Sequence, residues 1–561
     1  MNLTWFFWLL VLGGSWLVLV TEVGVQWSLY DQYRYGWAVP LLCVYLLGRR
    51  LTRGQVSATA VGCSALFSPT PRSKMRLSSS CHLAVAMLLC GLLPLYGVTR
   101  WLHEANPIWR LSTLLWSVEI IALSLWSLYW LQGWQAVQRF WPPITFFLLA
   151  VPWPSSLEHL VIQAFTRLNT AVSAEVLGLA GVPVLQHGNA IETTSGAIGI
   201  DDACSGIRSL QASLMVSVFL GEFYWLTVAR RSLCVLAACM LSIVCNWVRT
   251  ILLAGIVATS GLVALSVWHD RLGVAVIVVS FVALWIVARC AAPRRTAIGT
   301  QPSFERGSFA AHFRHLCRDI RNPPFGRCAS RGLLLTLGMW LVLVEVGSRG
   351  WYWFHDQELP RPPHDWSVNR ASSITGFHEV GVAPEIQRQL QPDLAFEARW
   401  PSTGGPSGQV YYFRWEPAGC VTKRAWIQLA RAHEPEVCLA GLGLRLRSRD
   451  GLIQVRAGSF PIAFLHETFC DSERTVHVFF GLYDDVTGPN QLASQRNDFR
   501  SRCFAAVSGH RNSGIRLLEI ALFDAESPEK AVDAIQTLVP QLLVETAPEN
   551  PEIADAQSRP K

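Results

Sequence analysis

Long apolar runs, separated by short polar segments, occupy most of the chain before residue 347. A helix that crosses about 30 Å of hydrocarbon needs about 20 mostly apolar residues. The runs therefore predict a polytopic α-helical membrane protein with about eight or nine transmembrane helices. In chain order, the expected spans are 3–20, 37–47, 82–98, 111–131, 140–151, 207–228, 232–253, 272–288 and 332–346.

Two stretches between these runs have a different pattern. At 157–181 the apolar positions recur at helical spacing, but Glu158, Arg167 and Glu175 interrupt them. This favours an amphipathic helix in the membrane interface over a span. Residues 183–202 combine glycines with short β-like pieces, so we expect an external hairpin there.

The basic residues gather in loops between the apolar runs. The chain is 51% hydrophobic and 16% charged, with a net charge of +7. Segments 49–81 and 230–231 are basic without acids, and 289–331 holds nine Arg against two acids. The positive-inside rule makes these loops cytoplasmic. The excess charge therefore indicates sidedness, and we expect no nucleic-acid partner. The first run lacks a basic leader and a small-residue cleavage site, so we interpret it as a retained span.

The composition changes after the last apolar run. Alternating segments typical of strands follow, together with more charge, which predicts an extracytoplasmic α+β domain. Ser527 and Pro528 are typical of an N-cap and a first helical residue, so a helix should start there. The predicted organisation is a catalytic membrane domain 1–292, a basic cytoplasmic linker 293–331, a final transmembrane helix 332–347, the extracytoplasmic domain 348–545 and a disordered tail 546–561.

Four cysteines, an even number, fall in the predicted extracytoplasmic domain: Cys420, Cys438, Cys470 and Cys503. In an oxidising compartment this favours at least one disulfide, and the sequence leaves all three connectivities open.

Three polar residues stand beside apolar runs and carry the candidate chemistry. Cys204 precedes the run at 207, Arg249 lies late in 232–253, and His269 precedes 272–288. The loop charges put all three at extracytoplasmic helix ends. The helix macrodipole should favour a thiolate at Cys204 and a neutral imidazole at His269. A thiol, a guanidinium and an imidazole on one face suit a cysteine peptidase or transpeptidase.

Nearby residues could support this chemistry. Asn246 lies three residues before Arg249 and so shares its helix face. Ser205 and Gly206 permit close backbone approach and offer N–H groups to an oxyanion. No second His or Cys stands at ligand spacing near His269, so we expect neither a metal nor a cofactor.

Each candidate also has an ordinary structural interpretation. Cys204 could be a packing residue of a membrane helix. Arg249 could extend its guanidinium to the lipid headgroups. His269 could be a solvated surface residue.

The order of these residues resembles the exosortase/archaeosortase family. The resemblance rests on Ala-Cys-Ser-Gly-Ile-Arg-Ser-Leu at 203–210, which includes Arg208, on Asn246-x-x-Arg249 and on His269-x-x-x-Gly273. Segments 35–42 and 147–154 resemble the family's Gly-x-x-x-Pro-Leu and Phe-Leu…Pro-x-Pro segments, so about 1–292 is covered. Arg34-Tyr35 replaces the His usually found near Trp37, which puts substrate detail in doubt. In the external domain, His-Glu-Pro-Glu-Val-Cys-Leu at 433–439 resembles the exosortase-associated C-terminal domain.

The resemblance implies a multi-pass enzyme of the bacterial inner membrane that cleaves C-terminal sorting tails of exported proteins at the outer face, in exopolysaccharide-linked surface sorting. Cys204 would attack the peptide carbonyl, Arg249 would stabilise the oxyanion and His269 would move protons. Asn246, Ser205, Gly206 and Arg208 would support the site or bind substrate. The implied partners are Pro-Glu-Pro-type sorting tails, membrane lipid, and a lipid or glycan acceptor. Hydrolysis and transfer both stay open.

Two alternatives remain at this point. The chain could be a non-catalytic membrane component of exopolysaccharide synthesis or export. It could also be a scaffold whose external domain does the work. The first alternative predicts that Cys204→Ala leaves function intact. Processing that survives deletion of 350–561 would reject the second.

Overall fold

The structure is a computed structural model that divides into two compact units. The first unit is Met1–Arg100 with Trp109–Val346, and the second is Trp101–Ile108 with Gly347–Lys561. The structure describes residues 3–545 except 61–87, 188–189, 194–195, 200–205, 293–330, 359–364, 403–404, 418, 432–434, 441–443, 471–474, 494–498, 512 and 524. Nearly all of the expected linker and the whole expected tail lie outside these residues.

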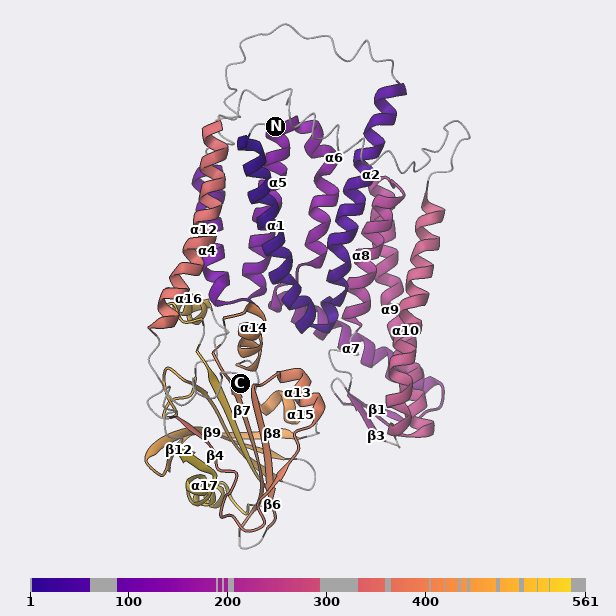
Figure 1. The fold of residues 1–561 in the computed structure, drawn as a ribbon. Coiled ribbons are helices and arrows are strands. Elements are labelled where there is room, and N and C mark those ends of the chain that lie inside the picture. The colour runs from indigo at the N-terminus through magenta and orange to yellow at the C-terminus, as the bar shows by residue number, and fades with distance from the viewer. Residues whose placement is uncertain are drawn as a thin grey trace, which may run out of the picture. The chain divides into compact units, whose positions relative to one another are not determined.

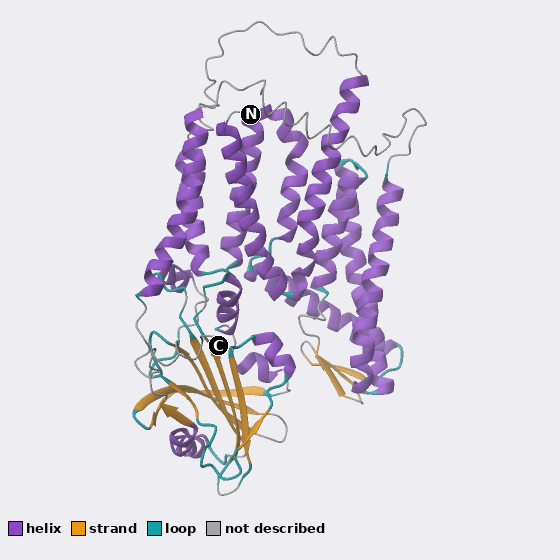
Figure 2. Ribbon diagram, viewed as in Figure 1, coloured by secondary structure: helices purple, strands orange, loops and turns teal. Residues whose placement is uncertain are grey.

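The first unit is helical, as Figures 1 and 2 show. Its elements are α1 (Leu3–Leu29), η1 (Asp31–Ala38), α2 (Val39–Ala60), η2 (Leu88–Leu92), α4 (Leu93–Ala105), α5 (Arg110–Gln132), α6 (Trp134–Thr145), η3 (Phe146–Ala150), α7 (Ser155–Leu179), β1 (Val184–His187), β2 (Ala190–Thr193), β3 (Gly196–Gly199), α8 (Ile207–Phe223), α9 (Val228–Ser260), α10 (Leu262–Ala291) and α12 (Arg331–Gln357). The ends of α4 and α12 belong to the second unit.

Five helices among the described residues are long and apolar enough to cross a membrane. They are Phe6–Leu29, Arg110–Trp130, Val228–Ser260, Val267–Ala291 and Gly332–Gln357. The bent pair Trp134–Ala150 and Ser155–Leu179 would make a sixth. This is fewer than expected, because three arginines interrupt α2 and α8 has only 17 residues. The polytopic helical class is confirmed, whereas the count of eight or nine stays a prediction.

Residues 152–206, between the fifth and sixth expected spans, contain a bent helix and a small sheet. Helix α7 turns by 72° from the helical segment before it, and its place in the membrane interface stays a prediction. The expected hairpin is present as a three-stranded antiparallel sheet in the order β1-β2-β3.

Helices α9 and α10 are longer than the sequence pattern predicts. The 33 residues of α9 correspond to about 50 Å at 1.5 Å per residue, more than the thickness of the hydrocarbon core. α10 starts at Leu262, ten residues before the expected span. The predicted starts at 232 and 272 were wrong because the polar residues at 230–231 and 269–271 were interpreted as lying outside the helices. In the structure these residues belong to α9 and α10. Gly261, at φ +76°, makes the tight turn between them.

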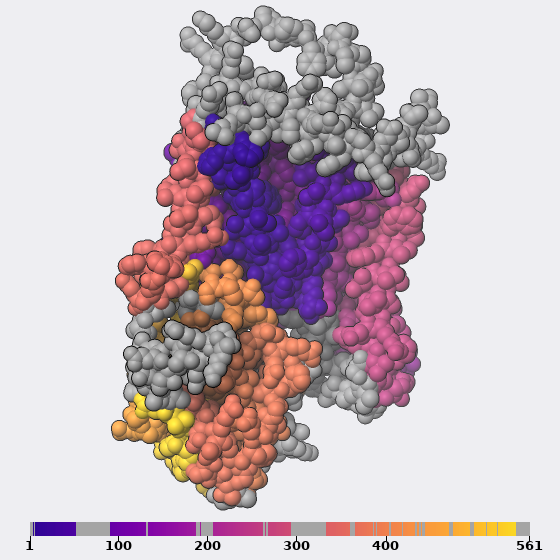
Figure 3. Space-filling view, in the orientation of Figure 1, coloured from indigo at the N-terminus to yellow at the C-terminus, as the bar shows by residue number. Residues whose placement is uncertain are grey.

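Aromatic side chains and one buried ion cluster hold the first unit together. The indole of Trp27 is fully buried and donates to the Ala150 carbonyl at 2.7 Å. The buried Arg100 guanidinium lies 2.7 Å from Glu345 and 3.5 Å from Glu22. Two carboxylates thus compensate a charge that would be costly alone at membrane depth, and they fix α12 to α4 and α1. By contrast, α10 leaves many apolar side chains exposed along one edge of this unit (Figure 3), as a lipid-facing helix should.

The second unit is built on an antiparallel sheet of seven strands in the order β5-β6-β7-β11-β10-β9-β8. One face packs on α17 and the other on α13 and α14, so the architecture is α+β. Helix α17 begins as predicted, with the Ser527 hydroxyl accepting from the Lys530 N–H at 3.3 Å. The elements are β4 (Trp366–Val368), β5 (His378–Val380), α13 (Pro384–Leu390), β6 (Leu394–Trp400), β7 (Ser407–Trp415), α14 (Val421–Ala430), α15 (Pro435–Ala440), β8 (Arg445–Ala457), β9 (Phe460–Cys470), β10 (Thr475–Asp484), α16 (Phe499–Val507), β11 (Ile515–Phe523), α17 (Pro528–Leu542) and β12 (Leu543–Glu545).

The expected disulfide is not formed among the described cysteines. Cys420, Cys470 and Cys503 are free thiols, and the Cys438 side chain lies outside the described residues. The three thiols stand on separate elements, namely the N-cap of α14, the end of β9 and the middle of α16. The expectation of at least one disulfide therefore stays a prediction, because an even number of cysteines does not decide whether the fold brings any two together.

Candidate active site

Arg249 and His269 face each other across the α9–α10 pair. The two helices run side by side from the turn at Gly261 (Figure 1), and Arg249 Nη2 lies 2.8 Å from His269 Nε2. A guanidinium has only N–H donors, so Nε2 must accept with its lone pair. This contact fits the tautomer of His269 that carries its hydrogen on Nδ1.

Asp270 accepts the proton on the other side of the ring. Its Oδ1 lies 3.1 Å from His269 Nδ1, and its side chain is 93% exposed. A carboxylate on Nδ1–H fixes the tautomer that leaves Nε2 free to accept a proton. Arg249 on α9, His269 and the exposed Asp270 on α10 thus form one row of contacts, in that order.

The structure does not give His269 the position at a helix N-terminus that the sequence predicts. His269 lies in the third turn of α10, not at the helix N-terminus. The macrodipole acts within the first turn only, so the prediction based on it is wrong. The His269 ring is instead oriented by its contacts with Arg249 and Asp270.

Asn246 lies against the segment that carries the candidate nucleophile. It is buried on α9, and a Cβ built on Gly206 would meet its side-chain carbon at 2.7 Å. Gly206 also has φ +87°, where other residues are strained. Only glycine suits this position, and the close approach keeps the start of α8 directly on the Asn246 amide.

Asn246 belongs to a polar stripe along α9. One turn before it, the Ser242 hydroxyl donates to the Ser209 carbonyl of α8 at 3.3 Å. One turn after it, the Thr250 hydroxyl accepts from Asn169 of α7 at 2.9 Å. Residues four apart share a helix face, so this stripe docks α9 on both neighbours and fixes the direction of Arg249 beside it.

Two predicted site residues cannot be placed. Cys204 and Ser205 lie outside the described residues. The structure thus brings together Gly206, Asn246, Arg249 and His269. Gly273 joins them, since Arg249 Nη2 lies 4.0 Å from the position of a Cβ there.

Arg208 points to a different part of the fold. Its Nη2 donates to Asp31 of η1 at 3.2 Å, and Asp31 also pairs with Arg34 at 2.7 Å. All three side chains are substantially exposed. Arg208 therefore connects the first turn of α8 to η1, and no contact with Arg249 is found for it among the described residues.

A buried polar network lies beside this connection. The Tyr33 hydroxyl donates to Glu158 at 2.6 Å and accepts from Gln211 at 3.2 Å and from the Trp153 N–H at 2.8 Å. Arg110 forms an ion pair with the other oxygen of Glu158. Desolvation by burial raises the pKa of Tyr33, although the hydrogen bond from the Trp153 N–H acts to lower it. The phenol therefore remains a donor at neutral pH. The network joins η1, α5, α7 and α8.

The comparison with known families covers this same part of the chain. The family model of the transmembrane exosortase matches residues 27–286. This match covers just under half of the chain, and over these residues the chain is similar to the transmembrane exosortase family. No curated protein and no solved structure matches the chain. The exosortase match ends before α12 and the second unit, so the resemblance of 433–439 to an exosortase-associated domain stays a prediction, and His433 lies outside the described residues.

Sequence reasoning about this exosortase segment missed two features. Asp270 follows His269 directly and could have been noticed as a carboxylate beside an imidazole. The Tyr33–Glu158 contact joins residues 125 positions apart. In the sequence, Tyr33 lies just before the segment 35–42 and Glu158 just after the segment 147–154. Such proximity to two motifs does not predict a contact.

Proposed function

We propose that this exosortase-family protein is a membrane cysteine peptidase or transpeptidase that cleaves C-terminal sorting tails of exported proteins at the extracytoplasmic face. The observation that carries the proposal is the 2.8 Å contact of Arg249 Nη2 with His269 Nε2, with Asn246 one turn before Arg249 and in contact with Gly206. Cys204 stands two positions before Gly206, and two residues of chain reach at most about 7 Å. The proposal requires the Cys204 thiol to lie within reach of the pair.

In the proposed reaction the His269 imidazole acts as the base. It takes the proton from the Cys204 thiol on Nε2, and the thiolate attacks the scissile carbonyl carbon. Asp270 holds the Nδ1–H and stabilises the imidazolium that forms. Because Nε2 accepts from Arg249 in the resting arrangement, this guanidinium donor has to leave when the proton arrives.

The released guanidinium donor then has a new partner. Arg249 keeps a positive charge throughout, so its N–H groups suit the oxyanion of the tetrahedral intermediate. Collapse of the intermediate breaks the C–N bond, and His269 returns its proton to the leaving amine. A thioester on Cys204 remains, which water hydrolyses or a nucleophilic acceptor takes over.

Co-expression with a tail-bearing substrate tests the proposal. We expect wild-type protein to convert the substrate, and Cys204→Ala and Cys204→Ser to lose nearly all conversion, since a hydroxyl is a much poorer nucleophile here. Cys290→Ala, an exposed thiol at the end of α10, is the matched control and should retain conversion. In a preparation starved of acceptor, wild type should accumulate a substrate adduct that hydroxylamine releases. Wild-type conversion by Cys204→Ala would instead favour a non-catalytic component or scaffold.

A further inference from the structure

Two buried histidines face each other in the sheet of the second unit. His466 on β9 and His477 on β10 are each 1% exposed, and His466 Nε2 lies 3.2 Å from His477 Nδ1. At most one of these two nitrogens can carry a hydrogen, so at least one lone pair points into the space between the rings. Burial lowers the pKa of both imidazoles, although the negative charge of Asp450 acts to raise it. Neutral imidazole is the form that binds metals.

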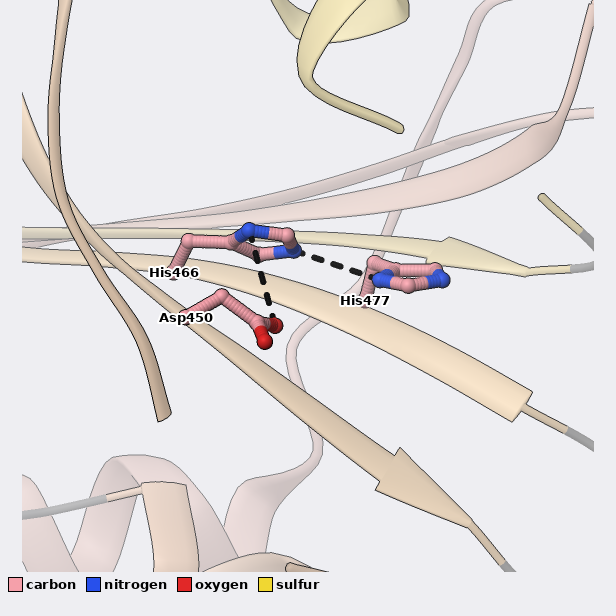
Figure 4. Close-up of side chains that lie close together, drawn as sticks. All are labelled: Asp450, His466 and His477. Carbon is pink, nitrogen blue, oxygen red and sulfur yellow. Dashed lines mark hydrogen bonds and ion pairs between the residues drawn. The ribbon is translucent and has the colours of Figure 1, made fainter. Parts of the chain in front are cut away.

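An acid completes the group from the neighbouring strand. Asp450 lies on β8, where the register with β9 shifts between Arg449 and Gly451. Such a bulge redirects the side chain of the extra residue. As Figure 4 shows, the carboxylate extends toward His466, with Oδ2 3.6 Å from His466 Nδ1.

From these contacts we propose that Asp450, His466 and His477 bind one divalent transition-metal ion of the zinc class. One ligand atom from each residue lies within 4.8 Å of the other two. Two ligands of a tetrahedral zinc ion, each about 2.0–2.1 Å from the metal, lie about 3.3 Å apart. The two imidazole nitrogens already have this separation. Asp450 is at the exposed edge, and its 3.6 Å contact is with the other nitrogen of His466, Nδ1. To complete the set its carboxylate has to turn toward the space between His466 Nε2 and His477 Nδ1.

The surroundings hold these ligands in place. The His466 ring stacks on Phe479, with centroids 4.4 Å apart and planes 7° apart. The Thr468 hydroxyl donates to Asp450 Oδ2 at 2.5 Å and lies 3.1 Å from His477 Nδ1. A residue that orients two ligands at once is typical of the outer shell of a metal site.

Three protein ligands leave a coordination position open. Closed structural zinc sites have four protein ligands, whereas three ligands leave a place for water or another small ligand. The exposed Asp450 edge gives solvent access to that position. The site uses none of the residues of the proposed peptidase, so its test does not depend on sorting activity.

Zinc binding to the full-length protein in detergent tests the proposal, with a purification tag free of histidine and with thiols blocked. After removal of metals by a chelator, Zn²⁺ is titrated against a chromophoric chelator. We expect one high-affinity ion per wild-type chain and its loss in Asp450→Asn and His477→Gln. Thr468→Val should bind about 10–100-fold more weakly. Asp533→Asn and His378→Gln, both exposed in the same unit, should bind as wild type does.

The thermal midpoint provides a second readout. Zn²⁺ should raise Tm for wild type and for both controls, but not for Asp450→Asn. Asp450→Asn decides the question even if His477→Gln fails to fold, because position 450 is exposed. Equal binding by folded wild type and Asp450→Asn, or no high-affinity ion on wild type, would overturn the proposal and leave a hydrogen-bonded histidine pair.

Discussion

Histidines occur in two different settings in this protein. In the exosortase segment, His269 is partly exposed and lies between a guanidinium and a carboxylate, so its two nitrogens have different partners. In the second unit, His466 and His477 are buried with their nitrogens facing each other. The first arrangement suits proton transfer, because one nitrogen is held as a donor and the other as an acceptor. The second suits a shared ligand, because a lone pair points into the space between the rings.

The two settings also differ in how the fold assembles them. Arg249 and His269 come from adjacent helices joined by a single glycine, so local geometry brings them together. The other pair depends on cross-strand register, in which Thr468 lies opposite His477 and His466 opposite Phe479. A one-residue slip in that register would turn His477 to the opposite face of the sheet.

The largest effect should follow from the loss of the planar guanidinium. Arg249→Lys keeps the charge but removes the fork that can donate to His269 and to an oxyanion together. We expect substrate conversion to fall by about 10²–10³-fold, as for the loss of an oxyanion donor. The control is Arg271→Lys on α10, whose guanidinium stacks on Trp268. Equal conversion by Arg249→Lys and wild type would show that Arg249 has no role in the reaction. The proposed difference between the His269 site and the His466–His477 pair would then not hold.

A smaller loss should follow from a methyl group at the contact between α8 and α9. Gly206→Ala puts a Cβ 2.7 Å from an Asn246 carbon and forces alanine into a left-handed conformation that costs about 1–2 kcal/mol. We expect conversion to fall by about 5–30-fold while the protein still folds. Gly255→Ala, also on α9 but with open space around it, should leave conversion unchanged. Conversion and thermal unfolding of both variants measure the effect, and wild-type conversion by Gly206→Ala would contradict the close approach.

Sequence reasoning singled out Asn246, Arg249 and His269 but not all of their neighbours, and Cys204 stays a prediction because it lies outside the described residues. Cys204, Asn246, Arg249 and His269 were predicted because the family order of motifs carries them. Arg208 belongs to the same motif, yet its side chain reaches Asp31. Which way a side chain turns at the start of a helix depends on the packing of α8 against η1, and no periodicity contains that information.

The fold itself was predictable only where local rules decide it. The Ser527 cap and the hairpin at 183–202 follow from local turn and capping chemistry. The ends of α9 and α10 do not, since the polar residues at 230–231 and 269–271 continue these helices, whereas the sequence pattern predicts helix ends there. The Asp450–His466–His477 group was also missed, because it requires both a strand register and a bulge. Ligand spacing in sequence could not have revealed it.

Asp270→Asn should have a smaller effect than either change above. The amide can still approach His269 Nδ1, but it no longer supplies charge to the imidazolium that forms in the proposed reaction. Because the Asp270 side chain is 93% exposed, solvent replaces part of this stabilisation. We expect about a twofold to fivefold fall in conversion and a changed pH profile, measured beside Asp533→Asn as a control in the other unit. An unchanged pH profile together with a wild-type rate would show that His269 needs no carboxylate, and the difference between the two histidine settings would then rest on Arg249 alone.

The smallest expected effect is a pH dependence of the second unit that leaves the first unit unaffected. Burial, and next the neighbouring Glu467 carboxylate, raise the pKa of Glu519 on β11 to about 7 from 4.5. The folded state therefore holds this proton more tightly than the unfolded state. Its contribution to stability is complete below pH 4.5 and is lost as the pH rises to about 7. We expect hydrogen-exchange protection of β10 and β11 amides, corrected for intrinsic exchange, to fall between pH 5 and pH 7.5. Glu519→Gln, which stays neutral, should flatten this dependence, whereas amides of α9 should behave alike in both proteins. A fall of equal size in Glu519→Gln would assign the pH dependence to another group, of which the buried histidine pair on the neighbouring strands is the first to examine.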